Sequence, residues 1–289
     1  MSNRTVRGLI VEARKLLADA GVDDVNFNAD CLAATVLGIA NSKLPLHWND
    51  AASEEFSTAF AGLVERRCRH EPLQYILGSW SFLDFEVNVG RGVLIPRPET
   101  EEVFMAAVKA IEKSDFASNF HFADIGTGTG ILGLALARRF SGAHGYLVDI
   151  SAEALRIASQ NLQNLGLCSR VCLLQSDLLG SFASNSLHVI ISNPPYIRKD
   201  DIAGLMPEVS VFEPHLALDG GSSGLEVIEK LLWQAAEALV SGGILVFEHG
   251  HGQREAIKRL ICDRWMLLEV GTDLYGCERY FVLKLGDFE

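Results

Sequence analysis

The sequence predicts an α/β protein in which a doubly wound, mostly parallel sheet follows a smaller helical domain. Three observations predict this fold. From residue 120 onward, short apolar runs alternate with helical patterns, the order of elements found in parallel sheets covered by helices. A glycine-rich turn, residues 126–130, directly follows the first of these runs, where α/β folds bind cofactors. The segment before residue 75 instead carries apolar residues at helical spacing.

The N-terminal segment is expected to form three helices. In the first, the apolar positions recur every three or four residues, at Val6, Leu9, Ile10, Ala13, Leu16 and Leu17. The second runs from Ala29 to Leu37 and stops at Gly38, and the third follows Ser53, a typical N-cap. Beyond Tyr75 the apolar residues lie among glycines, which indicates a short hairpin. We therefore expect a helical domain over 1–75, a hairpin linker over 76–95 and a catalytic domain over 96–289.

The catalytic domain is expected to begin with an extended Pro96–Pro98 segment and a helix that Thr100 caps. Strands are predicted at 120–125, 145–149, 170–176, 187–192 and 243–248, separated by helices at 131–140, 151–165, 225–240 and 252–264. Two last strands, 266–271 and 279–285, are joined by a turn and predict an antiparallel pair at the end of the sheet.

Composition and charge narrow the function classes. The chain has 289 residues and a net charge of −12, which argues against a surface that binds nucleic acid broadly. Its dense cationic run, Arg66, Arg67, Arg69 and His70, is either a solvated helix end or a docking patch. The start resembles no signal peptide and no segment is long and apolar enough to span a membrane, so we expect a cytoplasmic protein. We also expect a monomer.

The sulfur and imidazole groups predict no metal centre. Six cysteines are scattered without a CxxC pair, and we expect free thiols that are buried or half-buried. His249 and His251 stand two residues apart, but no carboxylate or cysteine at the usual spacing completes a site.

The glycine turn predicts the cofactor. In Asp124-Ile-Gly-Thr-Gly-Thr-Gly130 the third glycine comes one residue too early for the dinucleotide fingerprint, and no P-loop lysine follows. The motif resembles motif I of the class I S-adenosylmethionine-dependent methyltransferases, in which this turn faces the methionine part of the cofactor. Asp149 ends the second strand, where a carboxylate can accept hydrogen bonds from both ribose hydroxyls. The resemblance assigns Asp177 to the adenine amino group and Leu178 to the adenine ring. The cofactor-binding residues expected are Gly126, Thr127, Gly128, Thr129, Gly130, Asp149, Asp177, Leu178 and Asn193.

The transfer chemistry is predicted at Asn193-Pro194-Pro195-Tyr196, which follows the fourth strand of the catalytic domain. An amide nitrogen is a poor nucleophile because its lone pair is delocalised into the carbonyl group. The Asn193 side-chain oxygen and the Pro194 carbonyl can accept both N–H bonds of such a nitrogen, which positions it and favours the charge it gains. Tyr196 can stack on the flat group, and the prolines remove competing donors. We therefore predict Asn193, Pro194 and Tyr196 as catalytic and all four residues as substrate-binding.

The tetrad alone fits either an exocyclic adenine amine or a protein glutamine. Along nearly its whole length, the chain resembles the release factor glutamine methyltransferase (HemK/PrmC) family. The stretches that carry the resemblance are Glu71–Gly78, Ile95–Glu101, Asp124–Gly130, Asn193–Tyr196, Phe212–Pro214, Leu218–Gly221, Glu248–Gly250 and Leu274–Gly276.

The resemblance implies a seven-stranded, Rossmann-like class I methyltransferase fold and N5-methylation of the Gly-Gly-Gln glutamine in class I peptide chain release factors. It implies S-adenosylmethionine as cofactor, S-adenosylhomocysteine as product, and an N-terminal helical domain that grips the protein substrate. Arg97 and Glu101 resemble a lid over the cofactor, whereas Phe212-Glu213-Pro214 is either part of the site or structural packing. Methylation of a ribosomal-protein glutamine, or of adenine in nucleic acid, remains the alternative.

Overall fold

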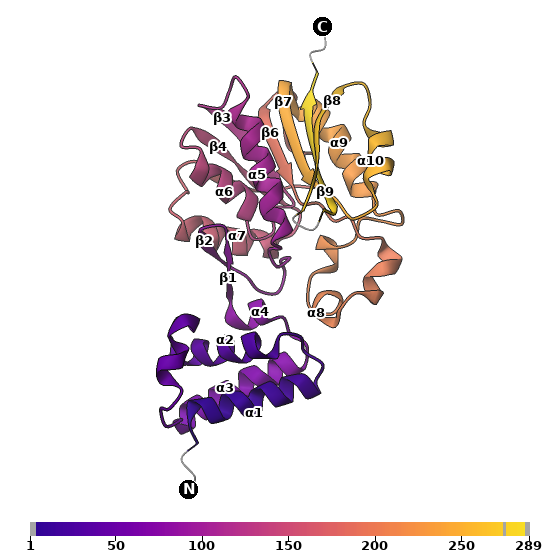
Figure 1. The fold of residues 1–289 in the computed structure, drawn as a ribbon. Helices are drawn as coiled ribbons and strands as arrows, with labels where there is room; N and C mark the ends of the chain where they lie inside the picture. The colour runs from indigo at the N-terminus through magenta and orange to yellow at the C-terminus, as the bar shows by residue number, and fades with distance from the viewer. Residues whose placement is uncertain (1–3, 274–275, 287–289) are drawn as a thin grey trace. The chain divides into compact units, whose positions relative to one another are not determined.

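The computed structural model describes residues 4–273 and 276–286, and the chain divides into two compact units (Figure 1). The first unit takes in Met1–Ser79 together with Met206–Phe212, and the second takes in Trp80–Leu205 and Glu213–Glu289. Leu274 and Tyr275, which belong to one of the family-like stretches, lie outside the described residues. The described helices contain none long and apolar enough to cross a lipid bilayer.

The first unit is helical, and its three main helices occur where the apolar spacing predicts them, although the second begins at Val25 rather than at Ala29. Its elements are α1 (Val6–Asp19), α2 (Val25–Leu37), the 3-10 helix η1 (Asn41–His47), α3 (Glu54–Cys68), α4 (Leu73–Leu77) and α8 (Pro207–Ser210). Ser53 caps α3 by accepting the Phe56 N–H, and Gly38 ends α2 in the left-handed conformation, both as expected. The side chain of Leu16 is an exception on the predicted stripe, because it is exposed.

The cationic run at the end of α3 is neutralised by acidic partners and is not a free basic patch. Arg66 donates two hydrogen bonds to Glu71, at 2.8 and 2.7 Å, and Arg69 pairs with Glu65. Arg67 is buried, whereas the sequence predicts either a solvated helix end or an exposed docking patch. Its guanidinium donates to the Asn28 side-chain oxygen at 2.8 Å, to the Glu71 carbonyl at 3.2 Å and to Glu208 at 3.0 Å.

The second unit holds a two-stranded and a seven-stranded sheet. The small sheet pairs β1 (Ser79–Phe82) with β2 (Phe85–Asn88), within the segment for which a hairpin is expected. The large sheet has the order β5-β4-β3-β6-β7-β9-β8. Its strands are β3 (Phe120–Ile125), β4 (Ala143–Asp149), β5 (Val171–Gln175), β6 (Leu187–Ser192), β7 (Leu239–Glu248), β8 (Trp265–Thr272) and β9 (Glu278–Leu285).

The pairing confirms the predicted topology. Strands β3 to β7 pair in parallel, whereas β9 pairs antiparallel with both β7 and β8. In the parallel register Ile125 lies beside Val148 on one side and beside Ser192 on the other, so β3, β4 and β6 end together. The strand order reverses at β3, since β4 lies on one side and β6 on the other, and ligands bind at such a switch point.

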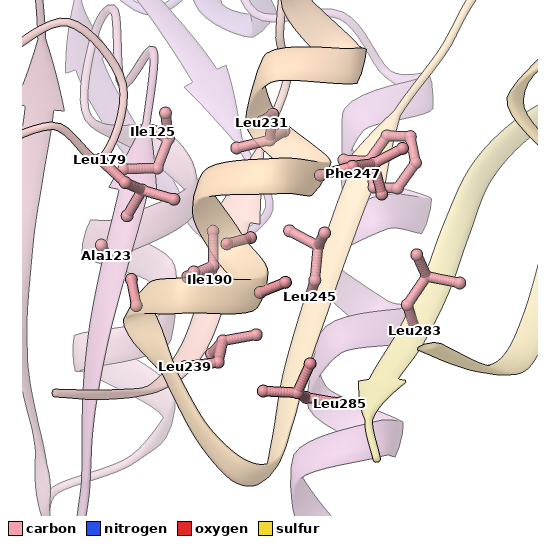
Figure 2. Close-up of a cluster of buried hydrophobic side chains, with 14 of the residues drawn as sticks. Ala123, Ile125, Leu179, Ile190, Leu231, Leu239, Leu245, Phe247, Leu283 and Leu285 are labelled. Carbon is pink, nitrogen blue, oxygen red and sulfur yellow. The ribbon is translucent and has the colours of Figure 1, made fainter. Parts of the chain in front are cut away.

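Helices cover both faces of the large sheet. They are α5 (Glu99–Glu112), α6 (Ile131–Arg139), α7 (Ala152–Asn164), α9 (Glu226–Ala238) and α10 (Arg254–Leu260), with the 3-10 helices η2 (Lys199–Gly204) and η3 (His215–Ala217). Figure 2 shows one cluster of buried side chains in the core, which includes Leu231 of α9, Ile190 of β6 and Leu245 of β7. Each fully buried Leu or Ile side chain contributes roughly 1.5–3 kcal/mol to folding. This core holds the strand ends in place.

Two further expectations from the sequence are wrong. Thr100 does not cap α5, because the helix already begins at Glu99, with Pro98 as its N-cap in helical conformation; the Thr100 side chain is buried. The six cysteines are free, but Cys168, Cys172 and Cys262 are exposed. Cys168 and Cys262 stand in loops, and Cys172 stands on the edge strand β5. At these positions the side chain faces solvent even though an apolar residue directly precedes it in the sequence.

Candidate active site

A cavity lies at the carboxyl ends of β3, β4 and β6, where the parallel register brings the strand ends together. It encloses about 780 Å³ of space, part of it open to solvent. Of the site residues predicted from sequence, those that line it are Gly126, Thr127, Gly128, Thr129, Asp149, Asn193 and Pro195. Residues more than 60 positions apart therefore meet in one site.

The glycine turn is built around a buried carboxylate. Gly126, Gly128 and Gly130 have φ angles of 66°, 54° and 90°, a region that side chains with a β-carbon rarely adopt. Asp124, only 1% exposed, accepts hydrogen bonds from the Thr127 hydroxyl at 2.6 Å and from the Gly133 N–H at 2.9 Å. Burial raises the pKa of Asp124 to about 6, although both hydrogen bonds oppose the shift. Asp124 thus fixes both sides of the turn.

Asp149 closes the turn from the neighbouring strand. One carboxylate oxygen accepts the Gly128 N–H at 3.0 Å, and the other accepts the Ser151 N–H at 2.9 Å. Burial raises the pKa of Asp149, against the effect of these N–H groups. Each oxygen of a carboxylate can accept a second hydrogen bond. The arrangement can therefore receive two adjacent hydroxyl groups, such as those of a ribose.

Asp177 and Leu178 lie outside the cavity lining formed by the described residues. The Asp177 carboxylate is 59% exposed and pairs with Lys230. Leu178, with a φ of 50°, packs against the hydrophobic core. The neighbouring Ser176 N–H donates to the Asp149 carbonyl at 3.1 Å, so this loop is anchored beside Asp149. The expected adenine contacts of the two residues remain a prediction.

The tetrad begins beside the glycine turn. The backbone oxygen of Asn193 lies 3.9 Å from the position that a β-carbon on Gly126 would take. Asn193 and Pro195 line the cavity, whereas Pro194 is buried and Tyr196 points its hydroxyl to Glu248, at 3.0 Å. Burial raises the pKa of Tyr196 far above its ordinary value, and the nearby Glu248 carboxylate adds to the shift, so the phenol is neutral.

Glycines and a glutamine hold the backbone of the tetrad from behind. A β-carbon on Gly220 would stand 2.8 Å from the Tyr196 Cα and 2.9 Å from the Pro195 carbonyl oxygen. Gln253 donates from Nε2 to the Tyr196 carbonyl at 2.9 Å and to the Gly224 carbonyl at 3.1 Å. The tetrad is therefore fixed by backbone packing and by direct hydrogen bonds.

Arg97 and Glu213 form another wall of the site. Arg97 lines the cavity and donates from Nη2 to both oxygens of Glu213, at 2.7 and 2.9 Å. The Glu213 side chain is 1% exposed, and burial raises its pKa to about 7 in spite of Arg97. Glu213 thus positions a cavity residue. Glu101, expected as part of a lid, lies outside the lining and accepts the Leu83 N–H at 3.0 Å.

Sequence reasoning missed the site roles of Thr100, Gly220, Glu248 and Gln253. The sequence does contain a signal for Glu248, which directly follows the apolar run Ile244–Phe247. A carboxylate at the end of a buried strand needs buried hydrogen-bond partners, so this position indicates a role in the site. The contacts of Gly220 and Gln253 connect distant segments and leave no local pattern. Among the described residues, no group of three or more His, Cys, Asp or Glu side chains is placed to hold a metal ion.

Comparisons with known proteins bear on both units of the chain. Residues 9–78 match the model of the PrmC N-terminal domain, and residues 106–208 match that of the methyltransferase small domain. A methyltransferase from Pyrococcus furiosus has a similar structure, with a TM-score of 0.54 and 18% identity over 77% of this chain and 99% of that one. At that identity the likeness shows the fold alone, which is the class I methyltransferase fold.

Curated relatives match over most of their length. The release factor glutamine methyltransferase of Moorella thermoacetica is 36% identical over 256 residues, 89% of each chain. That of Gloeobacter violaceus is also 36% identical, over 92% of this chain and 93% of its own. That of Nitratidesulfovibrio vulgaris is 33% identical over 98% of this chain and 96% of its own. The identity extends through both units, and the chain therefore belongs to the release factor glutamine methyltransferase family.

Proposed function

We propose that this chain transfers the methyl group of S-adenosylmethionine to the side-chain amide nitrogen, N5, of the glutamine in the Gly-Gly-Gln motif of class I peptide chain release factors. The observation that carries the proposal is the position of Asn193, which lines the same cavity as the glycine turn and Asp149. A group that holds an amide nitrogen and a turn suited to a cofactor therefore face one space.

The cavity fits the cofactor chemically. The turn of residues 126–130 presents backbone without side-chain bulk, and Asp149 keeps acceptor capacity for the ribose hydroxyls. Ile131 and Leu132 add apolar wall. We assign Asp177 and Leu178 to the adenine end, on the position of their loop beside Asp149. When bound, the cofactor supplies a methyl group on a positively charged sulfur, and S-adenosylhomocysteine is the product.

The tetrad supplies the positioning of the acceptor. The Asn193 side-chain oxygen and the Pro194 carbonyl accept the two N–H bonds of the glutamine amide, which orients its nitrogen and favours the positive charge that it gains. Prolines at 194 and 195 offer no backbone N–H that would compete for these acceptors. The methylated nitrogen then releases its extra proton to water, since it becomes acidic once its lone pair is used.

The family favours a protein glutamine over an adenine amine. The net charge of −12 and the neutralised arginines at the end of α3 also disfavour a nucleic-acid substrate. Residues of the helical unit are assigned to grip the release factor, in agreement with the match of residues 9–78 to the PrmC N-terminal domain.

A competition for labelled methyl groups tests the proposal. The protein is incubated with methyl-labelled S-adenosylmethionine, a purified class I release factor, ribosomal proteins and duplex DNA. We expect label in the release factor, and none when the glutamine of Gly-Gly-Gln is changed to alanine. Label in the ribosomal proteins or the DNA, with none in the release factor, contradicts the assignment.

A further inference from the structure

One buried carboxylate connects the two functional side chains of the tetrad. Glu248, at the end of β7, is 2% exposed. It accepts hydrogen bonds from the Tyr196 hydroxyl at 3.0 Å and from the Thr100 hydroxyl at 2.9 Å. The Thr100 oxygen in turn lies 3.3 Å from the Asn193 Nδ2. Thr100 is itself only 1% exposed, so water does not compete for the bond between Thr100 and Glu248.

The number of protons in this network determines which group donates and which accepts each hydrogen bond. A hydroxyl group has one proton, and an ionised carboxylate has none. When Glu248 is ionised, Thr100 donates its only proton to the carboxylate, and the Thr100 oxygen can then only accept. The Asn193 carboxamide must therefore turn its NH2 group toward Thr100. This leaves the Asn193 oxygen free for the cavity, as an acceptor for the substrate N–H.

A neutral Glu248 permits the opposite direction. If the carboxyl group carries a proton, it can donate to Thr100, and Thr100 can donate to the Asn193 oxygen. The carboxamide would then present its NH2 group to the substrate amide, and two donors would face each other. The side chain that contacts the reacting nitrogen is thus oriented by the charge of a residue that does not contact it.

The groups facing Glu248 come from several elements. Tyr196 follows β6, Thr100 and Glu99 stand on α5, and Arg279 stands on β9, beside the Tyr280 that pairs with Glu248 in the sheet. Burial raises the pKa of Glu248, and Glu99 adds to this, whereas the two hydroxyl groups and Arg279 oppose the shift. His249, the next residue, is buried, and burial lowers its pKa.

We propose that Glu248 is a positioning residue for methyl transfer: through Thr100 it determines which atom of the Asn193 carboxamide faces the acceptor nitrogen, and it also holds the Tyr196 hydroxyl. The inference rests on the role given to Asn193 under the proposed function. Glu248 contacts neither cofactor nor substrate in this scheme.

The variant Glu248→Gln keeps the size of the side chain but has an acceptor for only one of the two hydroxyl groups. We expect kcat to fall on the order of 100-fold, because the reacting nitrogen loses its positioned acceptor. The affinity for S-adenosylhomocysteine and the KM for the release factor should stay nearly unchanged. A kcat equal to that of the wild type overturns the proposal, as does a loss of activity that a parallel loss of cofactor affinity explains.

A matched control exists in the same sheet. Glu269 on β8 accepts the Tyr280 hydroxyl at 3.1 Å, so it forms a second tyrosine–glutamate pair, away from the cavity lining. Glu269→Gln should leave kcat unchanged. Thr100→Ser keeps the hydroxyl and should keep activity, whereas Thr100→Val should lower kcat. The double variant Thr100→Val/Glu248→Gln should be no slower than the slower single variant, because both changes break one chain of hydrogen bonds. If the losses of kcat in the two single variants add in the double variant, the proposed series of hydrogen bonds is contradicted.

Two further readouts separate positioning from general stability. Protonation of Glu248 should contribute to the acid limb of the pH profile of kcat, and this contribution should be absent in Glu248→Gln; an acid limb identical to that of the wild type contradicts the proposal. The side-chain NH2 resonances of Asn193, identified by their loss in Asn193→Ala, should shift in Glu248→Gln but not in Glu269→Gln, and this measurement needs no substrate. A wild-type enzyme that leaves release factor unlabelled refutes the proposed function, whereas unshifted Asn193 resonances refute this inference.

Discussion

The carboxylate of Asp149 accepts the backbone N–H of Gly128 at 3.0 Å, so the end of β4 is tied to the glycine turn that follows β3. The turn and the carboxylate thereby form one rigid surface of the cavity. The sequence predicts the turn and the carboxylate as two separate features, but the hydrogen bond between them makes the position of each dependent on the other.

Asp149→Ala is expected to weaken cofactor binding. The change removes the two charge-assisted acceptors proposed for the ribose and releases the Gly128 N–H, and hydrogen bonds to charged groups contribute roughly 1.5–3 kcal/mol each. Calorimetric titration with S-adenosylhomocysteine should show a loss of affinity of at least about tenfold. The control Asp201→Ala removes an exposed carboxylate and should bind normally. If Asp177→Ala binds S-adenosylhomocysteine as tightly as the wild type in the same assay, the adenine contact assigned to Asp177 is wrong.

Asn193→Ala is expected to separate turnover from cofactor binding. Its side-chain oxygen is assigned to the acceptor nitrogen, so kcat should fall on the order of 100- to 1,000-fold, comparable to the loss of one group that stabilises transition-state charge. Affinity for S-adenosylhomocysteine should be largely kept. Asn164→Ala, an exposed asparagine at the end of α7, serves as the control and should be fully active. Undiminished turnover in Asn193→Ala rules out the role given to it.

Gly220→Ala tests whether backbone packing positions the tetrad. The added β-carbon would meet the Tyr196 Cα at 2.8 Å and the Pro195 carbonyl oxygen at 2.9 Å, contacts that backbone atoms cannot easily relieve. We expect kcat to fall about 10- to 100-fold from displacement of the tetrad. Gly204→Ala is the matched control, because nothing lies within 4 Å of its added β-carbon. Equal activities in the two variants would show that the tetrad tolerates displacement.

Arg67→Met is expected to destabilise the helical unit. The guanidinium is buried and donates to Asn28, the Glu71 carbonyl and Glu208. Its removal takes the donor from the buried Asn28 oxygen, whereas Glu208 keeps its contact with His70. Urea denaturation should show a loss of about 1–3 kcal/mol of unfolding free energy. Arg69→Met removes an exposed partner of Glu65, with a side chain 72% exposed, and should change stability by less than about 1 kcal/mol. A similar loss in both variants argues against a special role for Arg67.

Asp124→Asn is expected to change how stability depends on pH. The pKa of Asp124 is raised from 3.8 to about 6 in the folded protein, so folding favours the protonated carboxyl. The contribution of this group to stability is therefore present below pH 3.8 and is lost as the pH rises to about 6, a loss of about 3 kcal/mol. Asparagine stays neutral. The difference in unfolding free energy, variant minus wild type, should rise across this window and then stay constant; a flat difference contradicts the shift.

Much of the fold followed from local patterns. The strand ranges at 120–125 and 187–192 agree with β3 and β6 to the residue, because an apolar run between polar ends reflects a strand buried on both faces. The antiparallel end of the sheet was also predictable from its turn. The start of α5 was not, since Thr100 has the residue type of a cap but is buried in the first helical turn, where its hydroxyl binds Glu248.

The candidate site was predictable where its residues stand at the carboxyl ends of the two strands that flank β3, as Asp149 of β4 and Asn193 after β6 do. It was not predictable where the contact joins segments far apart in the chain. Thr100 and Glu248 are 148 positions apart, and Arg97 and Glu213 are 116 apart. No periodicity spans such intervals, and only the folded sheet shows which carboxylate serves which partner.

The assignment of Met206–Phe212 to the helical unit has a consequence for engineering. The chain leaves the catalytic unit after Leu205 and returns to it at Glu213, so the helical unit is discontinuous in sequence. An exchange of N-terminal segments between relatives would carry over Arg67 without the Glu208 that it binds. A chimera that transfers residues 1–79 alone is therefore an incomplete module, and a functional swap should include residues 206–212 as well.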